Sequence, residues 1–295
     1  MQRLTIKMVA DVPSINHHNF FARQKRMWWH MLWLLPLLCF CAYSCYLFKE
    51  YRAAASLTTH FRAMLIGHRG AGSLAPENTL AAIDSGIAYR ADFVEIDIHQ
   101  TSDGKLVVMH DKTVNRTTNG HGQIADLSYS DVSKLSIKDE KGILMEGLRV
   151  PLLEEVLAKI SKTETRLIIE LKNPDKYPGI LDNLSQVIKN QAVQKKVMVF
   201  SFDKASLRAF RKLMPEIPIG AFCFGQENIY KLKDMDYICP SIYSLYLRPE
   251  IVDDIHQLGK KTFVWTLDKP GQMRFALKKD VDGIITNRPD VFRRL

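Results

Sequence analysis

Residues 92–111 read DFVEIDIHQTSDGKLVVMHD, and this stretch decides how the rest of the chain is interpreted. Two apolar runs, at 92–98 and 106–109, flank a short polar turn with the letters SDG. The turn leaves no room for a crossover helix, so the two runs are predicted to pair as an antiparallel hairpin. In that register residue 97 lies across from residue 109 or 110. The second run therefore belongs to a hairpin that leaves a larger sheet at its rim and returns to it.

The rest of the chain from residue 64 onward alternates short apolar runs with helix-like stretches, which indicates βαβ units and a parallel sheet. The apolar runs lie at 64–67, 92–98, 106–109, 166–171, 196–201, 217–222, 237–239, 261–266 and 283–286. The helix-like stretches include 78–89, 152–160, 204–214 and 249–258. Without the returning run eight strands remain, which predicts an α/β fold of the (β/α)8 TIM-barrel type. Residues 111–150 form a long polar connection, predicted to be an insertion with a function or a small structure of its own.

An apolar segment precedes this barrel. Residues 27–48 read MWWHMLWLLPLLCFCAYSCYLF, 22 residues with no Asp, Glu, Lys or Arg. A membrane-spanning helix needs about 20 mostly apolar residues, so one N-terminal transmembrane anchor is predicted. A cleaved signal peptide is the alternative, but the long polar lead and the lack of an A-x-A site argue against it. The predicted organisation is a basic segment at 1–26, the anchor, a linker at 49–63 and the catalytic barrel at 64–295.

The charge of the chain is concentrated beside this apolar segment. The net charge is +9, and residues 1–63 hold eight basic and two acidic residues. The positive charge is denser before the segment than after it, which places the N-terminus in the cytoplasm and the barrel on the non-cytoplasmic side of a membrane. The barrel region itself is nearly balanced, so a nucleic-acid partner is not expected. The five cysteines show neither zinc-site spacing nor a disulfide framework.

Charged side chains gather where the predicted strands end, which is the edge that carries the active site in barrels of this type. Charged groups at four strand ends of an otherwise apolar barrel are difficult to explain as a contribution to stability. These residues are His68 and Arg69, Glu95 and Asp97, His110, and Glu170 and Lys172.

Three of these side chains are carboxylates with the spacing of a metal site. Glu95 and Asp97 are two residues apart, so on a strand they point to the same side and repel each other unless a positive charge lies between them. Glu170 repeats the pattern on another strand. Three converging oxygen ligands suit a hard divalent cation, Mg²⁺ or Ca²⁺.

The remaining polar residues suit proton transfer and phosphate binding. His68 and His110 come from different strand ends and have side chains that titrate near neutral pH, as a general acid and base require. Arg69 and Lys172 are candidates for phosphate contacts. Each residue also has a plain structural interpretation when taken alone.

Three nearby residues have such alternatives as well. Asn78 is a candidate helix N-cap, and Glu77 is a candidate partner of the helix dipole. Trp265 is a candidate filler of the barrel interior.

Several motifs in order along the chain resemble the glycerophosphodiester phosphodiesterase family. They are HRGAGSLAPENTLAAI from residue 68, VEIDIHQTSDGKLVVMHD from residue 94, IIELK from residue 168, VWT from residue 264 and GIITNRPD from residue 283. The resemblance covers residues 64–295. It implies a TIM barrel and divalent-cation-dependent hydrolysis of glycerophosphodiesters to sn-glycerol 3-phosphate and an alcohol.

The resemblance also assigns roles to residues. It implies that Glu95, Asp97 and Glu170 bind the metal and that His68 and His110 are the acid/base pair. It implies substrate or phosphate contacts for Arg69, Lys172 and Trp265, and a role in shaping the site for the PEN element at 76–78. The sequence departs from the family pattern at Asn287, where the family commonly has Asp, and in the Thr-Leu-Asp that follows Trp265. Both departures are expected to affect substrate detail alone.

The sequence leaves two alternatives to this function open. The first is a lysophospholipase D acting on membrane lysophospholipids, which is favoured by the short distance between the predicted anchor and the barrel. Apolar residues of the rim loops are candidates to receive its acyl chain, such as Leu74, Ile143, Leu144 and Tyr243–Tyr246. An inactive, membrane-tethered binding barrel would show the loss of a metal ligand, and the sequence retains all three.

Overall fold

The computed structural model describes residues 63–295 and, further upstream, residues 41, 43, 44 and 46. The predicted basic segment at 1–26 and nearly all of the predicted anchor and linker lie outside the described residues. Among the helices of the described part of the chain, none is both long and apolar enough to cross a bilayer.

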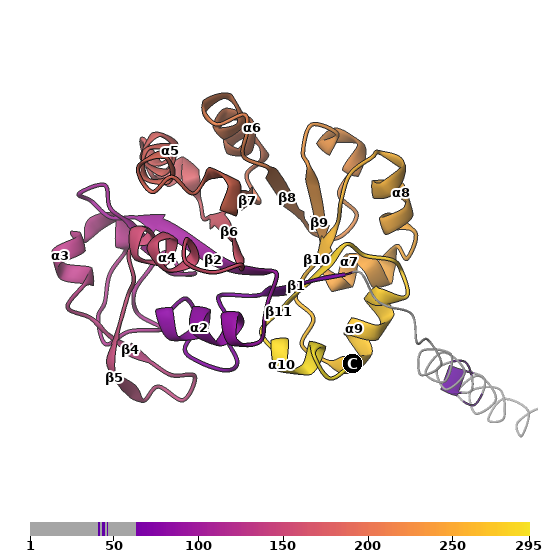
Figure 1. Cartoon of the computed structure of the whole chain (residues 1–295), viewed down its shortest axis with the longest axis horizontal. Coiled ribbons are helices and arrows are strands. Elements are labelled where there is room, and N and C mark those ends of the chain that lie inside the picture. Colours follow the sequence, from indigo (N-terminus) through magenta and orange to yellow (C-terminus); the bar gives the residue numbers. More distant parts are fainter. Residues whose placement is uncertain (1–40, 42, 45, 47–62) are drawn as a thin grey trace, which may run out of the picture. The chain divides into compact units, whose positions relative to one another are not determined.

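Eight parallel strands form a nearly closed barrel, as the sequence pattern predicted (Figure 1). The strands follow the spatial order β10-β11-β1-β2-β6-β7-β8-β9. Their bounds are β1 Met64–Gly67, β2 Phe93–Gln100, β6 Arg166–Leu171, β7 Val197–Ser201, β8 Ile219–Cys223, β9 Tyr237–Pro240, β10 Phe263–Val264 and β11 Gly283–Thr286. Between β9 and β10 the ladder is reduced to two isolated bridges, Tyr237 with Lys261 and Ser241 with Trp265. The run at 261–266, predicted as a full strand, therefore contributes only two strand residues.

Helices surround this barrel on its outside (Figure 1). They are α2 Leu80–Ala88, α4 Leu153–Ile160, α5 Ile180–Asn190, α6 Lys204–Leu213, α7 Ile242–Leu247, α8 Ile251–Gln257, α9 Pro270–Leu277 and α10 Pro289–Phe292. Short 3-10 turns η2 Pro174–Lys176, η3 Gln194–Lys196 and η4 Ile229–Leu232 lie in the connections. The four helix-like stretches of the sequence correspond to α2, α4, α6 and α8, with ends that agree within a few residues.

The hairpin predicted from residues 92–111 is present. Strand β3, Leu106–Val108, runs antiparallel to β2, with His99 paired to Val107. The Met109 amide donates a hydrogen bond to the Asp97 carbonyl at 2.9 Å, which is the register expected from the turn length. The hairpin therefore brings the chain back to the rim of the barrel beside Asp97.

The insertion at 111–150 has a small structure of its own. It contains η1 Ile124–Asp126, α3 Tyr129–Val132 and a two-stranded antiparallel sheet of β4 Ser136–Lys138 and β5 Leu144–Arg149. Its separate apolar core consists of Val107, Met109, Val114, Ile124, Val132, Ile137 and Val150. Because it packs on the hairpin, the insertion supports the segment that carries His110.

The interior of the barrel is filled by aromatic and branched side chains, so it forms a floor under the polar rim. Phe200, Tyr237 and Phe263 belong to this inner cluster, and the rings of Tyr237 and Phe263 lie 4.7 Å apart. Gly220 provides room for it, since a Cβ there would lie 2.5 Å from the Phe200 ring. This alternation of large and small residues fills the taper of a barrel. Cys223 and Cys239 on neighbouring strands are both buried and free, so no disulfide joins them.

Candidate active site

The turn after β1 places His68 and Arg69 over the mouth of the barrel. Arg69 and Gly70 both have positive φ, 51° and 90°, and Gly70 lies against α2 so closely that a Cβ would meet the Ala82 backbone at 2.6 Å. The Arg69 amide donates to Glu95 Oε2 at 2.9 Å, and the Gly70 amide donates to the Glu95 carbonyl at 2.9 Å. A glycine is needed where the chain both reverses and approaches a helix.

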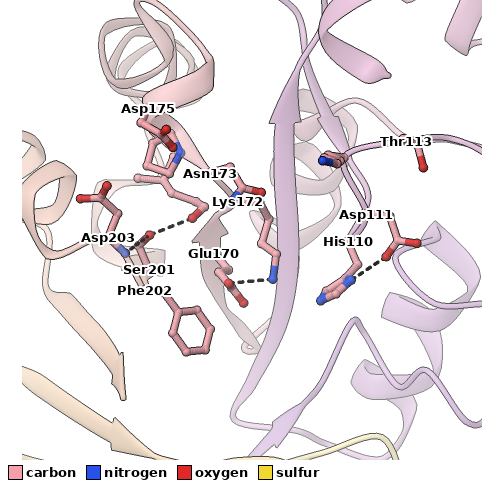
Figure 2. Close-up of a pocket in the computed structure, with 13 residues that line it drawn as sticks. His110, Asp111, Thr113, Glu170, Lys172, Asn173, Asp175, Ser201, Phe202 and Asp203 are labelled. Carbon is pink, nitrogen blue, oxygen red and sulfur yellow. Dashed lines mark hydrogen bonds and ion pairs between the residues drawn. The ribbon is translucent and has the colours of Figure 1, made fainter. Parts of the chain in front are cut away.

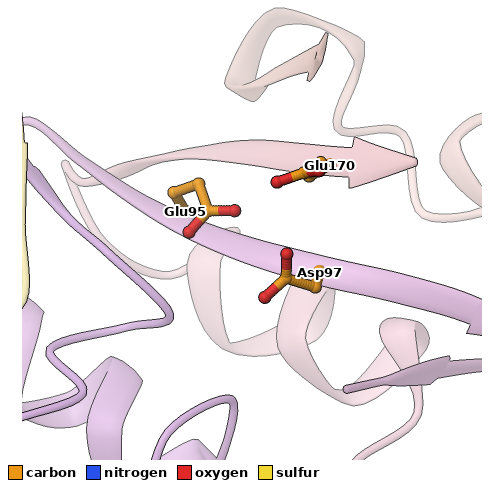
Figure 3. A group of neighbouring side chains, drawn as sticks. All are labelled: Glu95, Asp97 and Glu170. Carbon is orange, nitrogen blue, oxygen red and sulfur yellow. The ribbon is translucent and has the colours of Figure 1, made fainter. Parts of the chain in front are cut away.

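Three carboxylates on two neighbouring strands converge on one place (Figure 3). Glu95 and Asp97 lie on β2, and Glu170 lies on β6 in register with Asp97. All three are buried, and one oxygen from each lies within 4.8 Å of the others. The sequence prediction that these carboxylates would converge on one point agrees with this geometry.

The electrostatics of this cluster fit a cation. Burial, followed by the charges of Asp97 and Glu170, raises the pKa of Glu95 well above its usual value. Burial and the neighbouring Asp97 raise the pKa of Glu170 to about 8. Glu95 Oε1 and Asp97 Oδ1 are buried and accept no hydrogen bond from any described residue. Buried carboxylate oxygens without donors are the ligands that a divalent cation takes.

Asp97 differs from the other two carboxylates because cations and an amide surround it. Burial favours its neutral form, but the charges of Lys172, His110 and Arg69 outweigh this and hold its pKa below the usual range. Lys172 Nζ lies 3.3 Å from Asp97 Oδ1 and 2.8 Å from Glu170 Oε1. The structure therefore keeps one ionised carboxylate at the centre of the cluster.

Asn78 is not the N-cap of α2, which is the structural role that the sequence suggested for it. Thr79 caps α2, accepting a hydrogen bond from the Ala82 amide. Asn78, at φ 57°, instead donates from Nδ2 to Asp97 Oδ2 at 2.8 Å and accepts from the Asp97 amide at 3.1 Å. The PEN element thus orients a carboxylate of the site.

His68 has one ring nitrogen toward the carboxylates and one away from them. Nε2 lies 4.0 Å from Glu95 Oε2, and Nδ1 lies 2.8 Å from Asn287 Oδ1. Burial, followed by the charge of Arg69, lowers the pKa of His68 to about 4, so its imidazole is neutral at pH 7. From the sequence, Asn287 is expected to affect substrate detail alone. The structure adds a direct contact of its side chain with His68, which the sequence did not predict.

His110 follows β3 and is held by a different kind of partner. Its Nδ1 lies 2.8 Å from Asp111 Oδ1, and burial lowers its pKa. Its backbone carbonyl lies 3.1 Å from Nε2 of the buried His99, whose Nδ1 lies 2.7 Å from the Tyr177 hydroxyl. His99 was missed from the sequence, although it lies two residues beyond Asp97 on the same strand face, a signal that period-2 alternation offers.

The sequence also did not predict a network of hydrogen-bonded charged side chains on the rim. Arg69 Nη1 donates to Glu77 Oε1 at 2.8 Å, and Arg116 donates to both Glu77 and Asp111 at 2.7–3.0 Å. These contacts lower the pKa of Asp111 and also lower the pKa of Glu77 against the opposing effect of burial. Arg116 lies in the long insertion, where no periodicity singles it out.

Two adjoining clefts open at this rim. One of about 100 Å³ is lined by His68, Arg69, His110, Glu170, Lys172, Phe202, Phe222, Trp265, Thr266 and Ile285. The other, of about 760 Å³, shares His110, Glu170, Lys172 and Phe202 and extends along Asp175 and Asp203 (Figure 2). Together with the carboxylate cluster, the clefts bring all eight site residues named from the sequence to one place.

Trp265 forms an aromatic wall of this site rather than filling the barrel interior. Its Nε1 donates to the Cys239 carbonyl at 2.7 Å, which fixes the ring. Phe202, Phe222 and Phe224 surround it with ring centroids 5.4, 5.7 and 6.2 Å away. Phe202 and Phe224 are exposed, so the wall is open to solvent.

Residues 68–291 match the model of the glycerophosphoryl diester phosphodiesterase family. The chain belongs to this family. A glycerophosphodiester phosphodiesterase of Caldanaerobacter subterraneus subsp. tengcongensis is 35% identical over 237 residues, covering 79% of this chain and 98% of the relative. The family resemblance of the sequence motifs and the expectation of an enzyme of this class are therefore confirmed.

Solved structures of the family share the fold. A glycerophosphodiester phosphodiesterase from Agrobacterium tumefaciens is 26% identical with a TM-score of 0.67, covering 79% of this chain and 100% of that one. An Oleispira antarctica phosphodiesterase, solved in complex with the product sn-glycerol-3-phosphate, is 24% identical with a TM-score of 0.72, covering 78% and 95%. The family match spans every side chain of the candidate active site.

Proposed function

We propose that this chain hydrolyses glycerophosphodiesters to sn-glycerol 3-phosphate and an alcohol. The observation that carries the proposal is the convergence of three buried carboxylates, two histidines from separate strand ends, an arginine and a lysine on one cleft. The substrate class follows from the relative that is 35% identical and matched over nearly its whole length. Phosphodiester cleavage needs charge neutralisation and proton transfer, and this set of residues can supply both.

Glu95, Asp97 and Glu170 are the proposed ligands of a divalent cation, Mg²⁺ or Ca²⁺. Support comes from their burial, the two carboxylate oxygens that accept no hydrogen bond from the described residues, and the preference of these ions for oxygen ligands. When bound, such an ion supplies Lewis-acid stabilisation of negative charge on the phosphate.

Arg69 and Lys172 are proposed to hold the phosphate. Arg69 Nε is buried and donates no hydrogen bond to a described residue, although it lies 3.7 Å from Asp97. It therefore has a donor to offer a phosphate oxygen, while its Nη1 is fixed on Glu77. Lys172 lines both clefts with an ammonium group that Glu170 and Asp97 keep charged, raising its pKa against the effect of burial.

His68 and His110 are proposed as the acid/base pair. One accepts a proton from the nucleophile, either water or the glycerol hydroxyl of the substrate, and the other protonates the leaving alcohol. Both line the smaller cleft, His68 directly after β1 and His110 after β3, so they approach it from two different segments of the chain.

A lysophospholipid substrate is the alternative, and one observation favours it. The open aromatic wall of Phe202, Phe222, Phe224 and Trp265 offers apolar surface beside the site, with Phe224 61% exposed. Leu74, Ile143, Leu144, Tyr243 and Tyr246, named from the sequence as possible acyl contacts, are exposed as well. An acyl chain would cover such a surface, whereas a glycerol moiety would not.

Choline release from glycerophosphocholine and from lysophosphatidylcholine tests both substrates on the full chain. We expect release from glycerophosphocholine to stop in EDTA and to return with Mg²⁺ or Ca²⁺, together with sn-glycerol 3-phosphate as product. Faster release from lysophosphatidylcholine would make the lysophospholipid the substrate. Activity that persists unchanged under chelation would refute the metal site.

The N-terminal organisation remains a proposal based on the sequence. We propose that residues 27–48 anchor the chain in a membrane as a single span, with the barrel from residue 64 on the non-cytoplasmic side. The support is the uncharged apolar run and the denser positive charge before it. Extraction of membranes with alkaline carbonate tests the anchor, because a peripheral chain would be released, and protease digestion of intact cells tests the orientation.

A further inference from the structure

The contacts of the His68 ring determine which of its two nitrogens can react. Nδ1 lies 2.8 Å from Asn287 Oδ1, and Nε2 is directed toward Glu95, with His68 lining the smaller cleft. In a neutral imidazole one nitrogen carries the proton and the other has the free lone pair. The partner of Nδ1 therefore decides whether Nε2 enters the reaction as a proton acceptor or as a donor.

The orientation of the Asn287 amide follows from its second partner, Asp268. Asn287 Nδ2 donates to Asp268 Oδ2 at 2.9 Å, and the Asn287 backbone amide donates to Asp268 Oδ1 at 2.8 Å. An ionised carboxylate can only accept hydrogen bonds, so the NH₂ group of the amide has to face Asp268. The amide oxygen is then left to face His68, and Nδ1 of the histidine has to be the donor.

A third donor supports the accepting role of Asp268. The Thr286 hydroxyl donates to Asp268 Oδ1 at 3.0 Å, and the same hydroxyl accepts from the Arg288 amide at 2.9 Å. Because the Arg288 amide occupies a lone pair of Thr286, the hydroxyl proton is free to be directed at Asp268. Asp268 therefore accepts three hydrogen bonds, from the Asn287 side chain, the Asn287 backbone amide and the Thr286 hydroxyl.

Asn287 is also confined on the side of the β1 turn. A Cβ added to Gly72 would lie 3.0 Å from Asn287 Oδ1, and the Ser73 amide donates to the Asn287 carbonyl at 3.3 Å. The backbone of Asn287 is thus held by the turn that follows His68, and its side-chain amide is held by Asp268 in the loop after β10. While Asp268 accepts from its NH₂ group, the side chain does not offer that group to the histidine.

We propose that Asp268 and Asn287 form a positioning pair that keeps the proton of neutral His68 on Nδ1 and leaves the lone pair of Nε2 toward the cleft. His68 then acts first as the proton acceptor. The hydroxyl proton of the nucleophile passes to Nε2 as its oxygen bonds to phosphorus, while the P–O bond to the leaving alcohol breaks and that alcohol takes a proton from His110. The Nδ1 proton stays on the His68 ring, where it donates to Asn287 Oδ1. This assignment rests on the proposed phosphodiesterase function but concerns the histidine tautomer, which can be measured without substrate.

His110 contrasts with His68 in this respect. Its Nδ1 is paired with the carboxylate of Asp111, whereas Nδ1 of His68 meets a neutral amide. A carboxylate partner stabilises a second proton on the ring more than an amide does. Of the two histidines, His68 is therefore the one arranged to begin the reaction without a proton on the nitrogen that faces the cleft.

Nitrogen NMR of histidine labelled with ¹⁵N in the full chain tests the tautomer directly, with His68→Ala identifying the His68 resonances. We expect the wild-type ring to carry its proton on Nδ1. Asp268→Asn should permit the amide of Asn287 to flip, because the new side chain can donate, and the His68 ring should then shift toward the Nε2–H form. A wild-type Nε2–H tautomer, or an unchanged tautomer in Asp268→Asn, would overturn the proposal.

Kinetics provide the second measurement. Asn287→Leu and Asp268→Asn should each lower kcat by about 100-fold and change KM by no more than about threefold, since proton transfer rather than binding is affected. Asn287→Asp should recover most of the activity, because a protonated carboxyl group reproduces the donor and acceptor of the amide. Asn183→Leu removes a side chain that bonds Gln100 away from the clefts and should stay within about twofold of wild type.

The two readouts separate the failure of this inference from the failure of the proposed function. If the wild-type protein releases no alcohol from any glycerophosphodiester, the proposed function fails, while the NMR result still decides the tautomer. If the protein is active and Asn287→Leu keeps both its kcat and its Nδ1–H tautomer, the positioning pair fails alone.

Discussion

Asp97 differs from Glu95 and Glu170 although all three carboxylates are buried in one cluster. Glu95 and Glu170 have raised pKa values, whereas Lys172, His110 and Arg69 keep Asp97 ionised. Lys172 contacts both Asp97 and Glu170, at 3.3 and 2.8 Å, so it does not distinguish them. The difference arises because Asp97 also has the charges of His110 and Arg69 and the Asn78 amide donor at 2.8 Å, while Glu95 Oε1 accepts no hydrogen bond from the described residues. A site with one fixed negative charge and two proton-competent carboxylates can exchange protons for a cation.

Loss of either histidine should abolish most of the activity without unfolding the barrel. His68→Ala and His110→Ala are each expected to lower kcat by about 10³-fold, because a positioned acid or base contributes roughly 10²- to 10⁴-fold. Both side chains lie at the rim and outside the apolar core, so circular dichroism and thermal unfolding should resemble wild type. Near-normal turnover of a glycerophosphodiester by either variant would contradict the assignment.

Asn78 should contribute to stability through its contact with Asp97. Asn78→Ala removes both hydrogen bonds between residue 78 and Asp97, so Asp97 Oδ2 loses its amide donor. Alanine also disfavours the positive φ of 57° at this position, and its methyl group makes no contact that offsets this strain. The expected loss is about 1–3 kcal/mol in the free energy of unfolding, measured in urea. Asn78→Gly is the matched variant, since it loses the same contacts but tolerates the backbone angle; it should be less destabilised than Asn78→Ala if strain contributes.

At the scale of elements, the contact between α2 and the turn after β1 positions the catalytic residues. A Cβ on Gly86 in α2 would lie 2.5 Å from the Gly70 carbonyl oxygen and 2.6 Å from Val94. The neighbouring residues His68 and Arg69 are thus held at a fixed distance from the helix. No sequence periodicity reveals this, because the requirement for glycine comes from a backbone atom of another segment.

Gly86→Ala should therefore destabilise the protein and displace the catalytic turn. We expect a loss of about 1–3 kcal/mol in the free energy of unfolding, because overpacking against backbone cannot relax by rotation of a side chain. Activity should fall as well, since His68 and Arg69 follow the displaced turn. Gly271→Ala in α9 is the matched control: nothing lies within 4 Å of its added Cβ, and it should be neutral or slightly stabilising. Equal effects of the two substitutions would show that helix propensity, not the close contact, is responsible.

At the scale of the whole molecule, the sequence allowed the barrel and most of the site to be predicted. The β2–β3 hairpin follows from a three-letter turn, and the carboxylates follow from period-2 alternation on β2, because both are local patterns. Asn287 and Arg116 were not assigned, since their partners lie 219 residues away at His68 and 39 residues away at Glu77. Contacts between segments so far apart depend on how the loops lie on the rim, which local patterns do not encode.

The coupling between pH, cation and stability gives a test of the whole site. Glu170 has a folded-state pKa of about 8, above the ordinary value of 4.5, and Glu95 is shifted in the same direction. A raised carboxyl pKa contributes stability that is fully present below about pH 4.5 and is lost as the pH rises through 8. His68 has its folded pKa near 4 and its unfolded value near 6.5, so it is neutral in both states above pH 7 and does not obscure this window.

Without a divalent cation, the Tm of the full chain should therefore fall between pH 7 and pH 8.5. Addition of Mg²⁺ or Ca²⁺ should raise the Tm, and by more at pH 8.5, because the ion binds ionised carboxylates and has fewer protons to displace. Glu170→Gln should weaken both the pH dependence and the response to the cation. Differential scanning calorimetry in EDTA and in each cation measures these effects. A Tm that responds to neither cation at either pH would show that the three carboxylates do not form a metal site, and the buried charge of the cluster would then have to be balanced by Lys172 and Arg69 alone.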